Sequence, residues 1–363
     1  MSSTQTIQPN ERMKKLSSQK PPQVTVAVVT YNGINVIKNC LDSLQSQTYK
    51  PAQILVIDNA STDNTPDWVE EHYSQIKVIR LNSNCGPNPA RNQGILNTPD
   101  NDLTLLVDDD AILAENCLNE LVKAYQRYPE AAILAPRLVY NDQRDTIQHE
   151  GAFIHYTAEA VLLNNDKPLN QGSKDITQVH AVSGTCLLVS KSAAKKIGLF
   201  DEDYFFGRTD GEFSFRLTIS GYKVYTVPDA VCYHRVKKRG LSKLFYQVRN
   251  RWYFILTTYS LKTLIVLAPA LLVYELFLIA YLLMQGKELE YIKAIFAVIK
   301  FWDKLMQKRK KAQNIKTRSD RELLRSDSLY MRDDLLKNSI LASVKSGLDK
   351  FFRTYWKLIY PLI

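Results

Sequence analysis

Three consecutive carboxylates, Asp108, Asp109 and Asp110, are the strongest sign of chemistry in this chain. They follow residues 103–107, an apolar run with the pattern of a buried strand. On an extended backbone, side chains two residues apart point to the same side, so Asp108 and Asp110 could share one divalent cation. Mg²⁺ or Mn²⁺ would then bridge them to a diphosphate. Three adjacent aspartates can also form a solvated turn, but their place after a predicted parallel strand favours the metal site.

The elements that must position these carboxylates alternate between strands and helices. Short apolar runs predict the strands, and helical spacing of apolar residues predicts the helices between them. The predicted strands cover residues 24–29, 54–57, 78–81, 103–107 and 132–135, and the predicted helices cover residues 34–44, 61–72, 90–96 and 118–125. Continuous apolar strands separated by helices indicate an α/β fold, with a mostly parallel sheet covered on both faces.

Polar residues end two more of these strands. Thr30, Tyr31 and Asn32 follow the first strand, and Asp58 ends the second. Ligands of such sheets bind beyond the carboxyl ends of the strands, so we expect these residues and the aspartates to meet in one crevice. The Asp58 carboxylate could accept hydrogen bonds from a base or a ribose, or it could cap the next helix. The first strand is followed by neither a GxGxxG motif nor a Walker loop, which disfavours a dinucleotide-binding dehydrogenase.

After about residue 140 the alternation stops. Residues 141–176 predict loops and short strands, and residues 180–190 predict a strand with a glycine at a tight place. Residues 210–219 predict a short helix, and residues 222–227 a last strand that leads to His234.

Six sequence blocks, taken together and in order, resemble family 2 glycosyltransferases, in particular bacterial rhamnosyltransferase-like members. The blocks are VTVAVVTYNG, ILVIDNASTDNT, NCGPNPARNQGI, LLVDDD, SGTCLLVSKSAAKKIGLFDEDYFFGRTDGEFSFRL and GYKVYTVPDAVCYHR. They cover about residues 22–255. The resemblance implies the GT-A fold, a nucleotide-diphosphate sugar donor (a dTDP- or UDP-sugar), a divalent cation (Mg²⁺ or Mn²⁺) and inversion at the anomeric carbon.

The same resemblance implies roles for individual residues. The nucleotide-sugar contacts would be Thr30, Tyr31, Asn32, Asp58, Arg91, Asp108 and Asp109. The metal ligands would be Asp108, Asp110 and His234, and the acceptor side would be shaped by Gly184, Tyr204, Phe205 and Phe206.

The resemblance also points to a catalytic base. The family places an Asp in an ED pair that opens a helix, and Thr209-Asp210 corresponds to that pair here. Inverting transfer needs a carboxylate that takes the proton of the acceptor hydroxyl, and Asp210 is our prediction for it. Thr209 and Glu212 also have the spacing of a capping box. Because Thr209 replaces the usual Glu, Glu212 is kept as the alternative base.

One departure from the family concerns polymerising members, which carry a QxxRW motif. Here Gln247 and the pair Arg251-Trp252 are one residue too far apart, within QVRNRW. Several spanning helices that could thread a polymer are also missing from the sequence pattern. Transfer of a single sugar is therefore favoured over processive synthesis.

The charge of the chain is unevenly distributed. Lys and Arg total 47 against 37 Asp and Glu, a net charge of +10; residues 1–234 hold 21 basic and 27 acidic side chains, and residues 235–363 hold 26 and 10. The basic end favours an anionic membrane surface as partner. Nucleic acid is disfavoured, because the aromatic residues of this end lie in apolar runs. Five scattered cysteines without a CxxC pair favour a reducing cytosol.

Residues 264–284 form an apolar run close to the length of a membrane span, broken by Pro269 and Glu275. A carboxylate in mid-span costs roughly 2.5–3.5 kcal/mol on insertion scales. Since both flanks are basic, we expect two half-length helices, bent at Pro269, that lie in the interface or enter and return. A single span is the alternative.

Residues 341–363 predict a basic amphipathic helix with aromatic residues, which is typical of a membrane-surface anchor. A helix packed on the body of the protein is the alternative interpretation. The predicted organisation is a flexible polar tail (1–22), a GT-A catalytic domain (23–256, with a nucleotide-sugar half 23–140 and an acceptor half 141–256) and a basic, helical, membrane-associated region (257–363).

The predicted function is transfer of one sugar to a membrane-held acceptor, which would be a lipid-linked glycan, at the cytoplasmic face of the membrane, by a peripheral or re-entrant protein. One alternative is a sugar-nucleotide nucleotidyltransferase, which would need a basic, Gly-rich loop after the first strand; residues 30–36 contain neither Lys nor Arg. The other is a non-catalytic carbohydrate-binding or scaffold protein, which the joint presence of Asp108, Asp110 and Asp210 disfavours.

Overall fold

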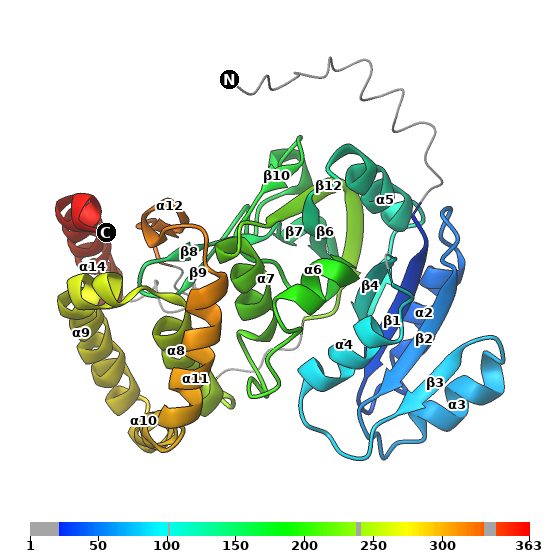
Figure 1. The fold of residues 1–363 in the computed structure, drawn as a ribbon, viewed down its shortest axis with the longest axis horizontal. Coiled ribbons are helices and arrows are strands. Elements are labelled where there is room, and N and C mark those ends of the chain that lie inside the picture. The colour runs from blue at the N-terminus through cyan, green and yellow to red at the C-terminus, as the bar shows by residue number, and fades with distance from the viewer. Residues whose placement is uncertain (1–21, 101, 237–240, 330–338) are drawn as a thin grey trace.

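The computed structural model describes residues 22–100, 102–236, 241–329 and 339–363. A large sheet with helices on both faces forms the body, and the helices that follow residue 243 gather at one side of it (Figure 1). The polar tail predicted for residues 1–22 lies outside the described residues, apart from Pro22.

The main sheet is mostly parallel, as predicted. Its strands are β1 (Val24–Thr30), β2 (Gln53–Asp58), β3 (Lys77–Arg80), β4 (Leu103–Asp108), β6 (Ala131–Tyr140), β10 (Thr177–Gln178), β11 (Cys186–Ser190) and β12 (Lys223–His234), with β5 (Ala111–Leu113) and β7 (Gln143–His149) paired to β12 and β6. The order across the sheet is β10-β12-β6-β11-β4-β1-β2-β3. β1 pairs in parallel with β2 and β4, whereas β11 runs antiparallel to β4 and β6.

Helices cover both faces of the sheet, and this explains why the central strands β1 and β4 are almost entirely buried. They are α2 (Ile37–Gln45), α3 (Thr65–His72), α4 (Pro87–Leu96), α5 (Cys117–Arg127), α6 (Lys191–Lys196) and α7 (Thr209–Ile219). Helices α2, α3 and α5 pack with Val26 and Val28 on one face, and α4, α6 and α7 pack with Ala27 and Val29 on the other. All seven residues of β1 are buried, so no alternation of polar and apolar residues is possible there.

Three predicted strands differ clearly from the observed ones. β12 continues from the predicted 222–227 as far as His234. β6 is longer than the predicted 132–135, because its second half pairs with β12 and β7 and so gains partners from distant sequence. The strand predicted for residues 180–190 begins only at Cys186. Residues 183–185 leave the ladder and bring Gly184 to the edge of the crevice.

The C-terminal helices are joined closely to the body. They are α8 (Leu244–Thr258), α9 (Leu261–Met284), α10 (Glu288–Lys300), α11 (Trp302–Ile315), α12 (Asp320–Leu323) and α14 (Ser339–Ile359). β13 (Leu324–Arg325) adds a parallel strand to β8 (Ala152–His155), which pairs with β9 (Ala160–Leu162). The predicted boundary at residue 256 falls inside α8, and α11 is anchored to the end of α8 because Arg309 Nη1 donates to Leu256 O at 2.5 Å.

The apolar run forms one continuous helix, so the prediction of two half-length helices is wrong. α9 has 24 residues and continues through Pro269. Glu275 faces the protein: it is 7% exposed, pairs with Arg251 Nη1, and accepts a hydrogen bond from Tyr291 Oη at 2.5 Å. Among the described residues, α9 is the one helix that is long and apolar enough to cross a membrane, and 28% of its apolar stretch is buried.

The amphipathic pattern at the C-terminus belongs to a helix packed on the body. Phe352, Trp356 and Ile359 of α14 are buried in one cluster with Tyr156. The Tyr156 ring stacks on Trp356 with 5.1 Å between centroids, and its hydroxyl donates to Phe352 O at 2.9 Å. These three residues of α14 pack on the body as in the alternative interpretation, whereas Val344, Phe351 and Leu358 of the same helix are exposed. The membrane-surface anchor stays a prediction.

Three buried histidines couple the stability of this fold to pH. Burial lowers the pKa of His149, His155 and His180 from 6.5 to about 4 in each case. Between these two values the unfolded chain binds a proton at each position and the folded chain does not. The free energy of unfolding therefore falls as the pH falls through this window, and the contribution is fully present above pH 6.5.

We expect the unfolding temperature to fall between about pH 7 and about pH 4.5 because unfolding takes up these protons. Replacing His180 with Gln removes one of them and should make the decline shallower. His72→Gln is the matched control, since the side chain of His72 is 47% exposed. Scanning fluorimetry across this range measures the effect, and equal slopes for His180→Gln and the unchanged protein would contradict it.

Candidate active site

The carboxyl ends of β1, β2 and β4 bring the predicted donor residues together. In the parallel register Thr30 lies beside Asp58, and Val29 lies beside Asp108. The strand ends therefore form one edge of the sheet, as the sequence predicted, and residues far apart in the chain meet there because the ladder aligns them.

The loops after β1 and β2 are bonded to each other. Asn32, in the left-handed region with φ of 53°, accepts a hydrogen bond from Thr62 N at 2.8 Å, and its own N–H donates to Ser61 Oγ at 2.8 Å. Asp58 is 2% exposed and accepts from Ser61 N at 3.1 Å, so it stabilises this loop and does not cap α3. Tyr31 is 47% exposed above these loops, which leaves its ring available for stacking.

The three aspartates each have a different partner. Residues 109 and 110 form a turn between β4 and β5, so the extended backbone expected here is wrong. Asp108 pairs with Arg91 Nη2 at 3.0 Å, and Asp109 accepts from Thr30 Oγ1 at 2.5 Å. A Cβ at Gly33 would collide with the Asp109 carboxylate, so only glycine allows this close approach.

Asp110 lies opposite His234, with 3.6 Å between Oδ1 and Nε2. The Nδ1 of His234 is 2.9 Å from Gln148 Oε1, and because that oxygen can only accept, Nδ1 carries the proton. In the neutral form of this imidazole, Nε2 would be the nitrogen available to a metal ion, on the side of Asp110. An imidazole whose second nitrogen is fixed by an acceptor, next to a carboxylate, has the chemistry of a metal-ligand pair.

This pair fits a divalent cation, while the full predicted set is not assembled. Asp108 is already paired with Arg91. Among residues 22–100, 102–236, 241–329 and 339–363, no group of three or more His, Cys, Asp or Glu side chains is placed to hold a metal ion. A cation held by Asp110 and His234 would need further ligands, for which diphosphate oxygens and water have the right chemistry.

Arg91 connects the edge formed by the ends of β1, β2 and β4, called the donor edge, with the start of α7. Its side chain is 5% exposed; Nη2 binds Asp108, and Nη1 donates to Thr209 Oγ1 at 3.4 Å. A Cβ at Gly184 would collide with Nη2 of the same guanidinium, so a larger residue there would require Arg91 to shift. The predicted nucleotide contact is therefore also the residue that joins the two sides of the crevice.

Asp210 and Glu212 have different environments. The predicted capping box is absent: Thr209 is the first helical residue, Arg208 is the N-cap with φ of 58°, and its side chain makes no cap hydrogen bond. Both oxygens of Glu212 accept from Arg216, at 2.7 and 2.9 Å, and the residue is 4% exposed. Asp210 accepts instead from two backbone N–H groups, Gly184 at 2.6 Å and Gly211 at 3.0 Å. These bonds hold its carboxylate at the wall of a cavity.

This cavity, of about 640 Å³, extends from Asp210 toward the C-terminal helices. The aromatic residues predicted for the acceptor side lie elsewhere. Tyr204 is 2% exposed and packs with Tyr253, Val298 and Leu305, in the core between α8, α10 and α11. Phe205 stacks on Tyr246 and Phe206 meets the edge of the same ring, with centroids 5.3 and 6.5 Å apart. Of the four predicted residues, Gly184 alone contacts Asp210 directly.

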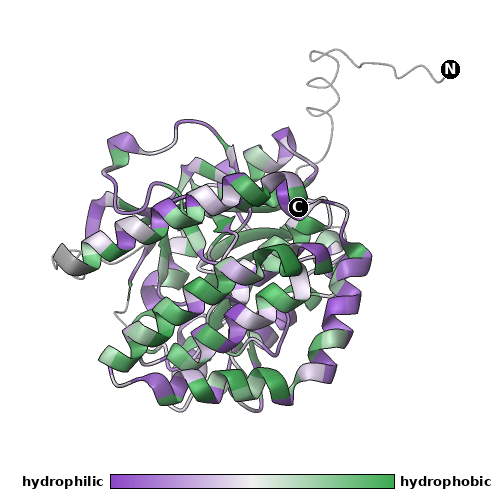
Figure 2. Ribbon diagram, turned by 90° about the vertical axis from the view of Figure 1, so that its left-hand side faces the viewer, coloured by the Kyte–Doolittle hydropathy of each residue, from purple (hydrophilic) through white to green (hydrophobic). Residues whose placement is uncertain are grey.

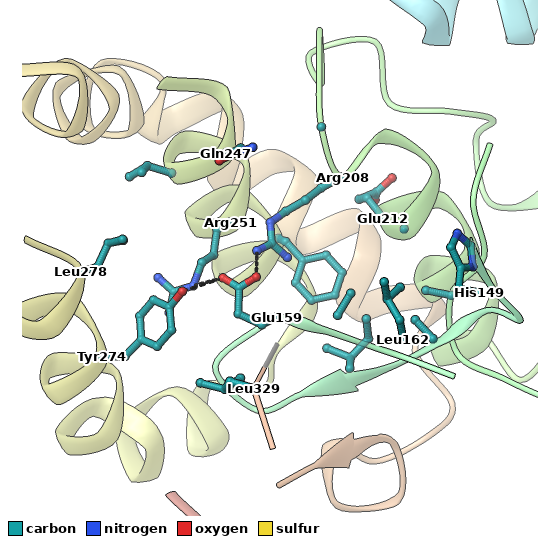
Figure 3. A pocket seen from close by; sticks show the side chains of 18 of the residues that line it. His149, Glu159, Leu162, Arg208, Glu212, Gln247, Arg251, Tyr274, Leu278 and Leu329 are labelled. Atoms are coloured by element: carbon teal, nitrogen blue, oxygen red, sulfur yellow. Dashed lines mark hydrogen bonds and ion pairs between the residues drawn. The ribbon is translucent and has the colours of Figure 1, made fainter. Parts of the chain in front are cut away.

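The cavity instead contains a charged network that the sequence did not predict. Glu159 lies at its centre, with Arg208 and Arg251 on either side and Tyr274 beside Arg251 (Figure 3). Arg208 Nη2 is 2.8 Å from Glu159 Oε2, Arg251 Nε is 3.5 Å from Oε1, and Tyr274 Oη donates to Oε1 at 2.8 Å. Burial opposes ionisation of Glu159, but the two arginines outweigh it and lower its pKa.

One sequence signal could have found part of this network. Gln247 and Arg251 of QVRNRW are one helical turn apart on α8, and both line the cavity. Their spacing is therefore suited to a helix face, although it departs from the motif of polymerising enzymes. Glu159 lies in the irregular segment 141–176, where no local pattern marks it.

Comparisons with known proteins agree with this architecture. The sequence model described as glycosyl transferase family 2 matches residues 25–198. N-acetylglucosaminyl-diphospho-decaprenol L-rhamnosyltransferase of Mycobacterium tuberculosis is 27% identical over 241 residues, which is 59% of this chain and 77% of that protein. O-antigen chain rhamnosyltransferase WbaN of Salmonella anatum is 25% identical over 215 residues, 59% of this chain and 66% of the relative.

Two further proteins extend the comparison. Poly-beta-1,6-N-acetyl-D-glucosamine synthase of Staphylococcus aureus is 24% identical over 233 residues, 63% of this chain and 53% of the relative. The crystal structure of GalNAc-T7 with UDP, GalNAc and Mn²⁺ superposes with a TM-score of 0.56 at 17% identity, covering 67% of this chain and 49% of that one. This structural likeness supports the fold. Residues 25–198 therefore form a family 2 glycosyltransferase domain, and the protein has a GT-A-like fold.

Proposed function

We propose that the protein transfers a single sugar, with inversion, from a nucleotide-diphosphate sugar to a membrane-held acceptor in the synthesis of a cell-surface glycan. The observation that carries this proposal is the position of Asp210. It is held by two backbone N–H groups at the wall of a cavity, and Arg91 connects its helix to the aspartates of the donor edge. Relatives that act on a decaprenol-linked sugar and on O-antigen chains support the acceptor class.

In this proposal the donor binds at the ends of β1, β2 and β4. The exposed ring of Tyr31 would stack on the base, while Asp58 and the loop around Asn32 would contact the nucleoside. Arg91, Asp108 and Asp109 would border the ribose and diphosphate. The donor would be a dTDP- or UDP-sugar, and the GalNAc-T7 structure, which contains UDP, supports a donor of this class.

Asp210 would act as the catalytic base. Inverting transfer requires that a carboxylate removes the hydroxyl proton of the acceptor while its oxygen attacks the anomeric carbon and the diphosphate leaves from the opposite side. The N–H groups of Gly184 and Gly211 orient the carboxylate toward that task. The alternative base, Glu212, is less suited, because Arg216 occupies both of its oxygens.

Asp110 and His234 would hold a divalent cation, Mg²⁺ or Mn²⁺, with Asp108 nearby. A bound cation would neutralise the charge that develops on the departing diphosphate. The His234 tautomer set by Gln148 and the approach of Asp110 to Nε2 support this assignment. The Mn²⁺ in the GalNAc-T7 structure agrees with a cation at this kind of site.

The C-terminal helices would hold the active site at the cytoplasmic face of the membrane. Large apolar side chains are exposed on α9 and α10: Leu261, Ile265, Leu272, Leu276, Leu283, Met284, Leu289, Ile292, Phe296 and Ile299. Figure 2 looks onto this side of the molecule and shows long apolar stretches on its helices. Helical spacing groups these residues on one stripe of each helix, and the basic excess after residue 234 would attract anionic headgroups.

The domain division is part of the same proposal. Residues 23–256 form the catalytic domain, with the nucleotide-sugar half 23–140 and the acceptor half 141–256, and residues 257–363 form the membrane-associated region. The cavity supports an acceptor half that works together with the last region, because residues from both line it.

Replacing Asp210 with Asn should lower kcat by about 10²–10⁴-fold because the hydroxyl proton loses its acceptor. Nucleotide-sugar affinity, measured by calorimetry, should be unchanged. Glu212→Gln is the comparison: it loses a buried ion pair, so the unfolding temperature should fall while the folded protein retains transfer. Near-normal transfer by Asp210→Asn would show that another group is the base.

Chelation with EDTA should abolish transfer, and Mn²⁺ or Mg²⁺ should restore it. His234→Ala should raise the Mn²⁺ concentration needed for half-maximal activity, because one of two proposed ligands is lost. Binding of Mn²⁺ in the presence of UDP, followed by electron paramagnetic resonance, gives a readout independent of turnover. His72→Ala serves as the control, and an unchanged Mn²⁺ affinity in His234→Ala would contradict the assignment.

The full chain should float with anionic liposomes, and the double variant Leu276→Glu with Phe296→Glu should not, because charge is placed on the apolar stripes. Leu96→Glu, at an exposed apolar position of α4 in the body, is the matched control. Flotation of the double variant at the level of the control would refute the proposed membrane surface.

A further inference from the structure

The cavity extends on both sides of the charged network. His149 and Glu212 lie on one side in Figure 3, Tyr274 and Leu278 lie on the other, and the charged network lies between them. Asp210 belongs to the first side. It lies at the start of α7, two residues after Arg208, and its negative charge partly offsets the lowering of the His149 pKa by burial. Leu162 lies beside His149, so apolar groups line this side too, and further ones, among them Phe277 and Leu278, line the side of α9.

The charged middle has no excess charge but contains one unmatched donor. Glu159 and Glu275 balance Arg208 and Arg251. Arg251 is 2% exposed, and its Nη2 has no hydrogen-bond partner among the described residues. The balanced charges disfavour a free, highly charged anion as the occupant.

The far end of the cavity is lined mostly by apolar side chains on three helices, together with the ion pair of Lys345 and Asp349 on α14. Phe277, Leu278 and Tyr281 come from α9, Leu348 and Phe352 from α14, and Leu244 and Val248 from α8. Sugar hydroxyls would find no partners among most of these groups, whereas hydrocarbon would be removed from water. The volume of about 640 Å³ is in the range of cavities that enclose ligands of moderate size.

Helix α9 connects this apolar end to the exterior of the protein. Leu278 lines the cavity, while Leu276, two residues earlier, is 59% exposed, as are Leu272 at 60% and Leu283 at 58%. The same helix therefore offers apolar groups on its cavity side and on its outer side. A chain that leaves the cavity past α9 would reach the surface proposed to face the membrane.

We infer that this cavity binds the hydrocarbon chain of a lipid-linked acceptor inside the protein, between α9 and α14, with the acceptor sugar placed at Asp210. The inference rests on the proposed function and adds that the lipid enters the protein and does not remain in the bilayer. The shared chemistry of the ligand is an unbranched or isoprenoid chain attached to a polar head; isoprenoid and acyl chains are separate arms of the test.

The test compares two substitutions on one helix. Leu278→Trp adds bulk inside the cavity, and Leu276→Trp adds the same bulk on the outer face. Radiolabelled farnesyl monophosphate and radiolabelled oleoyl lysophosphatidic acid, each below its micelle concentration, are the probes for equilibrium dialysis with the full chain. We expect saturable binding of at least one probe, about tenfold or more weaker in Leu278→Trp and unchanged in Leu276→Trp. The probe that binds identifies the chain class.

Three results would overturn the inference: no saturable binding of either probe, equal loss in both variants, or displacement of the probe by excess inorganic phosphate, which would show that the head alone is bound. If Leu278→Trp does not fold, Leu348→Trp on α14 blocks the cavity from the opposite wall. Hydrolysis of a nucleotide-sugar panel with Mn²⁺ separates the two proposals. Lipid binding without any turnover would refute the glycosyltransfer alone, and turnover without lipid binding would refute the cavity assignment alone.

Discussion

The buried guanidinium of Arg91 is the interaction on which the crevice depends. It pairs with Asp108 at the end of β4 and contacts Thr209 at the start of α7. An arginine that is 5% exposed needs a carboxylate partner, because an unpaired buried charge is strongly destabilising. Meeting that requirement brings the ends of β1, β2 and β4 and the helix of Asp210 to a fixed separation. Gly184 lets residues 183–185 pass close to the Arg91 guanidinium.

A second buried network of charges holds distant segments together around the cavity. Glu159 and Glu275 are held by Arg208 and Arg251, and each of these residues comes from a different part of the chain. The network ties the residue before the first turn of α7 to the apolar helix α9. A carboxylate in an apolar helix is tolerated here because its charge is matched within the protein and is not exposed to hydrocarbon. Helix α9 is thereby held at the wall of the cavity.

Much of the fold could be predicted because the parallel strands are short, apolar and bounded by polar turns. The first four strands, β1 to β4, begin within one residue of their predicted starts. Prediction was weaker where the pairing partners of a strand are distant in sequence, as in β6. It was also weaker where an amphipathic helix can lie either on a membrane or on the protein. For α14 the amphipathic pattern did not tell which apolar residues are covered: Phe352 and Trp356 pack against Tyr156, far away in sequence, and Leu358 is exposed. Likewise Pro269 did not divide α9, since packing on one side of the helix supports it.

The sequence by itself determined the resemblance to the family, the parallel sheet and the set of carboxylates proposed for the chemistry, because these depend on local order and spacing. The tertiary structure decided how those carboxylates are used. It gave the three adjacent aspartates separate partners, left Asp210 at the cavity and bound Glu212 to Arg216, and moved Tyr204 into the core. It also built the cavity from Glu159, Arg251 and α9. Such assignments depend on which side chains compensate one another's charge across the folded chain, and no local pattern contains that information.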